Sequence, residues 1–223
     1  MKLSANAIPL VAYTRREEIL NTATHALGLI LSGFIFVQCL LPALVAHDRL
    51  RIVCGCLYFF GTTLTFLTSV AYHAVSSAER KKVLRLFDHC AIFFAVAGTA
   101  TGCVPAVYDT VGVVPAVLMP VAAWSGALIG LFLTLFAFET TKPAQMVCYV
   151  ATAVICAVCG AGAYKVLPHG AFYCFLGGSA SLILGFIPFS LGRNRPYFHA
   201  LFHIFVDCGL LIYYIGIEKY CFH

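Results

Sequence analysis

Seven apolar runs of membrane-spanning length constrain the fold of this 223-residue chain more than any other feature of its sequence. A transmembrane helix needs about 20 apolar residues, and charges or Pro/Gly clusters separate these runs from one another. Only 10% of the residues are charged, against about a quarter in an ordinary soluble chain. The sequence therefore predicts an all-α integral membrane protein with seven transmembrane helices, at residues 19–46, 51–74, 84–107, 113–138, 144–163, 170–191 and 197–217.

These spans leave little chain outside the membrane. We expect a cytosolic N-terminal tail at residues 1–18, a seven-helix transmembrane domain at 19–217 and a short external tail at 218–223. The start of the chain lacks the long apolar stretch and small-residue cleavage site of a signal peptide. The weakest boundary is at 107–112, and its loss would give six spans, but a run from 84 to 138 is far too long for one helix.

The distribution of Lys and Arg predicts the orientation, because cytosolic loops retain positive residues. With seven spans, the N-terminal side carries ten of them and the other side four. We therefore expect a cytosolic N-terminus and an external C-terminus. The net charge of +5 sits at helix ends rather than in one stripe, which argues against nucleic acid and for contact with membrane lipids. The cluster that best fits anionic headgroups is Arg80, Lys81, Lys82 and Arg85.

Ionisable side chains within the spans are costly in a bilayer, so they are candidates for function. With seven spans, most of them fall near helix ends on the N-terminal side of the membrane. The sequence therefore predicts that they gather at one end of the bundle. They are His25, His73, Asp88, His89, His199, His203 and Asp207.

Three of these histidines fit a zinc site. His199 and His203 are four residues apart, which places both rings on one helix face, and His73 would complete the set. Three neutral histidines and a water form the open, catalytic kind of zinc site. Asp88 could orient or deprotonate that water, and Ser69 lies one helical turn before His73.

Other interpretations of these residues stay open. An H-x-x-x-H pair at a helix end is also typical of interfacial histidines, and Ser69 could bond only its own helix backbone. His89 points away from Asp88 on its helix, which favours an interfacial position. Asp207 and His25 are candidate neighbours of the zinc ligands, and Asp207 would serve equally as part of a proton path.

Six short motifs follow one another along nearly the whole chain. They are EE-x-x-N-x-x-TH-x-x-G (Glu17 to Gly28), S-x-x-x-H (Ser69, His73), R-x-x-DH (Arg85, Asp88, His89), AGT-x-T (Ala97 to Thr101), W-x-x-A-x-x-G (Trp124, Ala127, Gly130) and H-x-x-x-H (His199, His203). In this order they resemble the hemolysin III branch of the progestin and adipoQ receptor family.

The resemblance implies a seven-helix fold with a cytosolic N-terminus. It also implies a zinc ion held by His73, His199 and His203, with Asp88 at the zinc water and Ser69 close by. The animal receptors of the family are linked to ceramide hydrolysis, and the compact form of this chain is similar to that of the bacterial members, which suggests a plasma (bacterial inner) membrane protein.

Three positions depart from the family pattern. Asp207 replaces an apolar residue, Tyr213 replaces an expected histidine, and Gly102 replaces a proline. The leading hypothesis is a membrane-embedded, zinc-dependent hydrolase of a lipid amide or ester, similar to a ceramidase, with a lipid as its substrate. The alternatives are a cytolysin, and a membrane sensor that zinc stabilises without catalysis.

Overall fold

A computed structural model describes residues 8–138, 140–141, 144–145, 147–148, 151, 154, 168–192 and 194–223, and these residues form helices without strands. Six helical stretches are long and apolar enough to cross a membrane. The predicted span at 144–163 lies mostly outside the described residues, so the seventh helix and the orientation stay predictions. The six are Arg15–Val45, Arg49–Ala74, Ala78–Thr110, Val113–Ala137, His169–Leu191 and Phe198–Cys221.

Two of the six stretches are composite. The first joins α1 (Arg15–Ile35), a π-helical turn η2 (Phe36–Leu40) and α2 (Leu41–Val45). The other joins α4 (Ala78–Gly102) to α5 (Val104–Thr110). The remaining stretches are single helices: α3 (Arg49–Ala74), α6 (Val113–Ala137), α8 (His169–Leu191) and α9 (Phe198–Cys221).

Helix α1 begins at Arg15 rather than at residue 19 because a capping box starts it. The Thr14 hydroxyl accepts a hydrogen bond from the Glu17 N–H at 3.3 Å, and the Glu17 carboxylate accepts one from the Thr14 N–H at 2.9 Å. This reciprocal pair satisfies two otherwise unbonded amides at the start of the helix. The predicted break at 107–112 lies at Gly112, whose φ of 114° lets the chain turn into α6.

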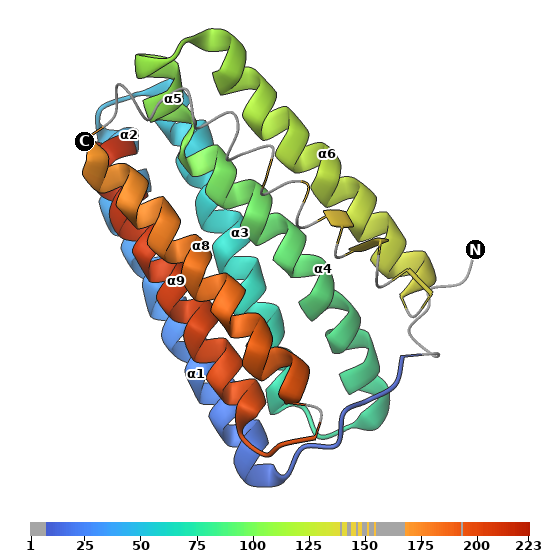
Figure 1. The fold of residues 1–223 in the computed structure, drawn as a ribbon. Coiled ribbons are helices and arrows are strands. Elements are labelled where there is room, and N and C mark those ends of the chain that lie inside the picture. Colours follow the sequence, from blue (N-terminus) through green and yellow to red (C-terminus); the bar gives the residue numbers. More distant parts are fainter. Residues whose placement is uncertain are drawn as a thin grey trace.

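The long helices lie side by side in one bundle (Figure 1). Helix α3 packs against α1 and α4, α9 packs against α1 and α8, and α6 covers the far side of α4. Helices α1 and α9 start at the same end of the bundle, which we call the histidine end (Figure 1). This arrangement brings the end of α3 next to the starts of α1 and α9.

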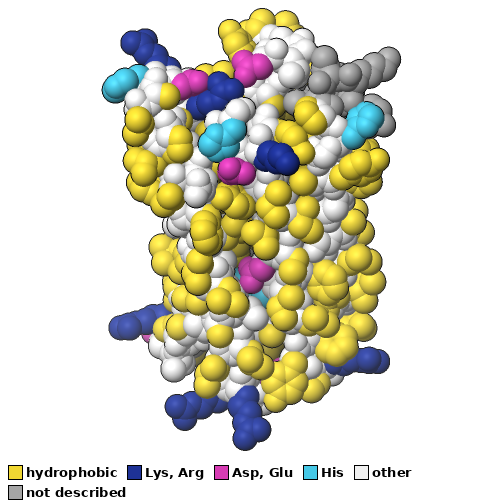
Figure 2. All heavy atoms as spheres, turned by 90° about the vertical axis from the view of Figure 1, so that its left-hand side faces the viewer, with side chains coloured by type: hydrophobic (Ala, Val, Ile, Leu, Met, Phe, Trp, Pro, Cys, Tyr) yellow, Lys and Arg dark blue, Asp and Glu magenta, His cyan; other side chains and the backbone are white. Residues whose placement is uncertain are grey.

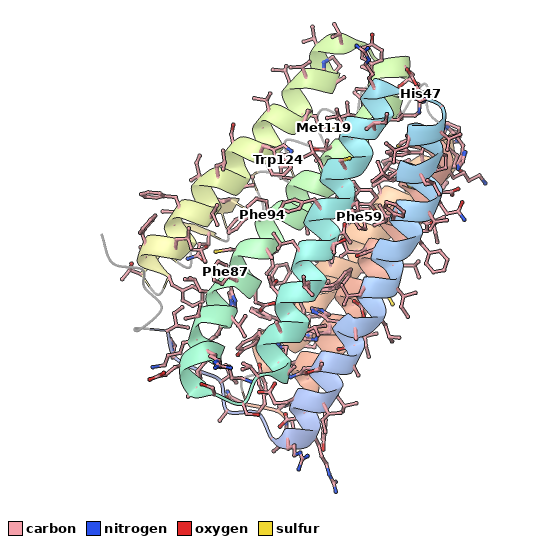
Figure 3. All side chains as sticks on the ribbon, turned by 180° about the vertical axis from the view of Figure 1, so that it is seen from behind. His47, Phe59, Phe87, Phe94, Met119 and Trp124 are labelled. Carbon is pink, nitrogen blue, oxygen red and sulfur yellow. The ribbon has the colours of Figure 1, made fainter. Side chains whose placement is uncertain are left out.

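Close backbone contact joins α3 to α4. A Cβ atom on Gly61 of α3 would overlap the carbonyl oxygen of Phe94, so only glycine permits this approach. Nearby, the Thr65 hydroxyl of α3 donates to the Ala91 carbonyl of α4 at 2.8 Å. On the other side of α4, Trp124 of α6 meets the Phe94 ring edge to face at 5.9 Å (Figure 3).

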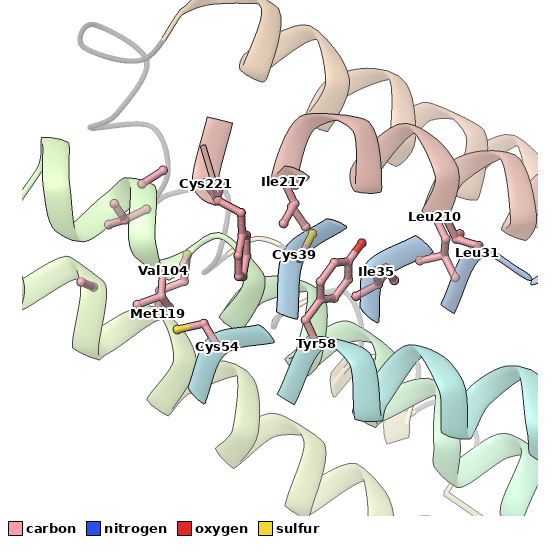
Figure 4. Packing of buried hydrophobic residues seen from close by; sticks show 14 of the residues in the cluster. Leu31, Ile35, Cys39, Cys54, Tyr58, Val104, Met119, Leu210, Ile217 and Cys221 are labelled. Carbon is pink, nitrogen blue, oxygen red and sulfur yellow. The ribbon is translucent and has the colours of Figure 1, made fainter. Parts of the chain in front are cut away.

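The opposite end of the bundle holds the largest apolar cluster. Tyr58, 1% exposed, lies among side chains from α1, α3 and α9, including Ile35 and Ile217 (Figure 4). Helix α9 continues to Cys221 rather than ending at 217, and the Cys221 side chain is 1% exposed in this cluster. Arg51 links three segments at this end of the bundle. Its guanidinium donates hydrogen bonds to the Asp48 carboxylate, the Asp109 carboxylate and the Cys221 carbonyl.

The face of the bundle in Figure 2 is mostly apolar between two charged ends. Large side chains such as Leu27, Val114 and Ile183 are about two-thirds exposed, at 64%, 64% and 66%. Such a surface would associate in water but suits the hydrocarbon core of a bilayer. Together with the six spans, it makes the chain a multi-pass integral membrane protein.

Candidate metal centre

The structure brings His73, His199 and His203 together at the histidine end of the bundle. His73 lies in the last turn of α3, and the other two lie in the first turns of α9. Each offers a ring nitrogen, and these three atoms lie within 4.8 Å of one another. His73 is 2% exposed and His203 1%. The helix-end and spacing argument therefore predicted the right neighbours, while zinc binding itself stays a prediction.

The separation of two ring nitrogens matches that of ligands on one metal ion. The Nε2 atoms of His199 and His203 are 3.1 Å apart. Zinc–nitrogen bonds of about 2.0–2.1 Å in tetrahedral geometry separate two ligand nitrogens by roughly 3.3 Å. These two nitrogens therefore need almost no adjustment to share a metal, whereas His73 would approach by up to about 1.5 Å.

Hydrogen bonds on the other ring nitrogens select the tautomers that a metal requires. The Nδ1 atom of His73 donates to the Glu18 carboxylate at 2.7 Å, which leaves its Nε2 atom buried and without a partner among the described residues. The Nδ1 atom of His203 lies 3.1 Å from the Asn21 carbonyl. A carbonyl oxygen only accepts, so this ring also presents the lone pair of Nε2 to the centre. The donor set therefore fits a zinc ion.

Glu18 belongs to the first motif, but no role in the site was predicted for it from the sequence. It accepts from His73 at one oxygen, and its other oxygen forms an ion pair with Lys81 at 2.6 Å. A carboxylate that receives the N–H of a ligating histidine orients the ring and raises its basicity. The spacing of Glu18, Asn21 and His25 at i, i+3 and i+7 marks one helix face and could have indicated this role.

The segment before α1 covers the histidine end. The Tyr13 ring stacks on His199 with 5.1 Å between centroids and 22° between planes, and it also lies 5.8 Å from the His73 ring. Burial raises the pKa of the Tyr13 phenol, so it stays protonated. Further back, Ile8 is 1% exposed and packs with Leu86 of α4. The N-terminal segment thus shields the three histidines from solvent.

Asp88 lies beside the cluster on α4. Its carboxyl group interacts electrostatically with His73 and with the Ser69 hydroxyl across the α3–α4 interface, although that hydroxyl does not reach full hydrogen-bond geometry. The Asp88 side chain is 17% exposed and Ser69 1%. His89 does not join the cluster: its Nδ1 atom lies 3.0 Å from the Arg85 carbonyl, and its ring meets the Phe138 ring.

His25 and Asp207 lie next to the cluster without belonging to it. The His25 ring stacks on His203 with 3.6 Å between centroids and an angle of 20°. Both His25 ring nitrogens are buried without a hydrogen-bond partner among the described residues, and the same holds for Oδ1 of Asp207. Asp207 is one helical turn beyond His203 on α9.

Comparison with known proteins identifies the family of the chain. The model of the family "Haemolysin-III related" matches residues 13–214. The chain is similar to a hemolysin-3 homolog of Bacillus subtilis (strain 168), with 25% identity over 94% of this chain and 96% of the relative. It is also similar to hemolysin-3 of Bacillus cereus, with 28% identity over 87% of each chain. Bacterial relatives of this kind and the six apolar helices place it in the plasma (bacterial inner) membrane. The chain belongs to the haemolysin-III related family of multi-pass membrane proteins.

Proposed function

We propose that the chain is a membrane-embedded, zinc-dependent hydrolase that cleaves an amide or ester bond in a lipid. The observation that supports this proposal most is the set of three histidines with two Nδ1 atoms already engaged and their Nε2 atoms turned to one point. A zinc ion bound there would polarise the substrate carbonyl and lower the pKa of water to roughly 7. The resemblance to proteins linked to ceramide hydrolysis suggests a ceramidase-like substrate.

The residues around the histidines suit the remaining steps. Asp88 accepts the proton of the attacking water, whose oxygen adds to the acyl carbon. The Ser69 hydroxyl, 1% exposed and without a full hydrogen bond, donates to the oxygen that becomes negative. The carbon–nitrogen or carbon–oxygen bond then breaks, and Asp88 returns the proton to the leaving group. The products are a fatty acid and an amine or alcohol.

The orientation belongs to the same proposal. The histidine end would face the cytosol because the residues that begin α1 and α4 are rich in Lys and Arg, which cytosolic loops retain. His203 is five residues into α9, which corresponds to a depth of about 8 Å at 1.5 Å per residue. The scissile bond of a lipid in the same leaflet lies at a similar depth, just below the headgroup.

Metal content tests the proposal directly. We expect elemental analysis of the detergent-purified protein to give about one zinc per chain and none in a folded His199→Ala/His203→Ala variant. His47→Asn is the matched control, because His47 is exposed at the opposite end of the bundle (Figure 3) and asparagine tolerates its φ of 54°. Wild-type protein without zinc after zinc loading would refute the mechanism.

Turnover separates the hydrolase from its alternatives. Zinc-bound protein should release fatty acid from lipid amides or esters, and Asp88→Asn should lose this activity while it retains zinc. Zinc-dependent thermal stability without any turnover would instead support a zinc-stabilised sensor, in which the metal links α3 to α9. The relatives' name keeps cytolysis as a further candidate, and release of liposome contents that is unaffected by loss of the histidines would favour it.

A further inference from the structure

Asp207 lies at the seam between α1 and α9, on the edge of the lipid-facing surface. On α9, His203 stacks on His25 of α1, and Tyr214 lies 6.5 Å from the Phe34 ring of the same helix. Residues 203, 207 and 214 share one helix face, so Asp207 also lies on the side of α1. We call this region, Thr24 and His25 of α1 with His203 and Asp207 of α9, the α1–α9 seam.

The seam meets the hydrocarbon region. The neighbours of Asp207 on α9, Ile204 and Leu211, are 46% and 45% exposed, whereas Asp207 itself is half-buried. Asp207 is nine residues after the first residue of α9, or about 13 Å along its axis. Figure 2 shows acidic and histidine atoms within the apolar belt, about midway between the charged ends. Polar side chains therefore interrupt the apolar belt there (Figure 2).

Polar atoms in the seam lack partners. Oδ1 of Asp207 and both ring nitrogens of His25 are buried without a hydrogen bond to any described residue. At the His203 side of the seam, by contrast, the Thr24 hydroxyl lies 3.1 Å from the Nδ1 atom of His203. An unpaired carboxyl group at this depth destabilises a membrane protein considerably, and such residues face ligands or substrates. These atoms of Asp207 and His25 can still form hydrogen bonds, which indicates that they bind a ligand.

We propose that the α1–α9 seam is a lipid-side substrate entrance in which Asp207 and His25 bind a hydroxyl group of the substrate near its scissile bond. This inference rests on the proposed function for the reaction but concerns recognition. Asp207 keeps an acceptor oxygen in either protonation state, and a neutral imidazole carries one donor and one acceptor. A hydroxyl group, which both donates and accepts, matches this pair better than an apolar or purely accepting group.

The position of the seam fits such a substrate. Asp207 follows His203 by one turn, so a group bound there is about 5–6 Å from the histidine cluster along the helix. The acyl chain would remain in the bilayer beside Ile204 and Leu211 while the carbonyl reaches the three histidines. The substrate class is therefore an acyl amide or ester that carries a hydroxyl group on the hydrocarbon side of its scissile bond, rather than a simple alkyl amide.

A matched pair of lipid probes tests this inference by binding rather than turnover. The probes are the N-propyl amides of hexadecanoic acid and of 3-hydroxyhexadecanoic acid, each with a photoactivatable diazirine in its chain, which differ in one hydroxyl group. In detergent-purified full-length protein, half-maximal cross-linking should need about tenfold less of the hydroxyl probe, because a hydrogen bond to a charged or buried group is lost with the other. Asp207→Leu should abolish the preference and keep the zinc content. Ile215→Ala, at an exposed position of α9 outside the seam, should retain both.

Equal cross-linking of the two probes to wild type, or an unchanged preference in Asp207→Leu, would overturn the inference. His25→Phe provides a second variant, since it keeps an aromatic ring against His203 and removes the hydrogen-bonding nitrogens. It should also reduce the preference. Hydrolysis of both probes at equal efficiency would refute the role of the seam in hydroxyl recognition and leave the proposed function intact. A clear binding preference without hydrolysis of any lipid would refute the proposed function and support the seam.

Discussion

Replacement of Glu18 by glutamine should weaken zinc binding without unfolding the protein. The Glu18 carboxylate receives the His73 N–H at 2.7 Å, and the side chains of the pair are 19% and 0% exposed. A charge-assisted hydrogen bond in such a buried position contributes about 1.5–3 kcal/mol, and a partner of this kind typically changes metal affinity about 10- to 100-fold. Glu18→Gln keeps the shape and one acceptor oxygen but removes the charge, so we expect a loss of about tenfold.

The assay is a competition for zinc between the purified protein and a fluorescent chelator at constant pH. Glu79→Gln is the matched control because Glu79 begins α4 at the same end of the bundle and is exposed. Its zinc affinity should equal that of the wild type. Lys81→Met should give a smaller loss, since Lys81 pairs with the Glu18 oxygen that does not face His73. An unchanged affinity in Glu18→Gln, or an equal loss in Glu79→Gln, would refute the orienting role.

Three further predictions concern stability in detergent. Gly61→Ala should lower the melting temperature because its Cβ overlaps the carbonyl of α4, while Gly33→Ala, which meets nothing within 4 Å, should not. Asp207→Leu should raise it, since an unpaired carboxyl group in the apolar belt is removed; a fall would mean that Asp207 has a stabilising partner. Asp48 accepts a backbone hydrogen bond at the start of α3, which lowers its pKa from 3.8. Its stabilisation, about 1 kcal/mol, is full above 3.8 and is lost as the pH falls from there through the lowered pKa. Asp48→Ala should therefore destabilise the protein at pH 7, and progressively less as the pH falls below 3.8, in thermal melts.

The apolar runs alone determined most of the fold. Water cannot satisfy backbone groups inside a bilayer, so each long apolar run has to form a helix whatever its neighbours are. Six of the seven predicted runs are helices of membrane-spanning length among the described residues, with ends shifted by a few residues. Those ends depend on caps such as Thr14 and on the continuation of α9 to Cys221, which polarity patterns do not encode.

The sequence also determined part of the candidate site. His199 and His203 are four residues apart on one helix, and this local spacing alone places both rings on the same face. The alternation of spans across the membrane then placed His73 at the same end. Both arguments use only helix geometry and the direction of each span, which a linear sequence contains.

Only the tertiary structure decided the contacts that make the histidine cluster chemically specific. The bond from His73 to Glu18 and the stacking of His25 on His203 join residues of different helices that are far apart in the chain. They depend on how far each helix is rotated about its axis and how closely it approaches its neighbour. Side-chain packing sets both quantities, for example where Gly61 lets α3 and α4 touch. Periodicity specifies which face of a helix is apolar, but the pairing of faces is a property of the whole packed bundle.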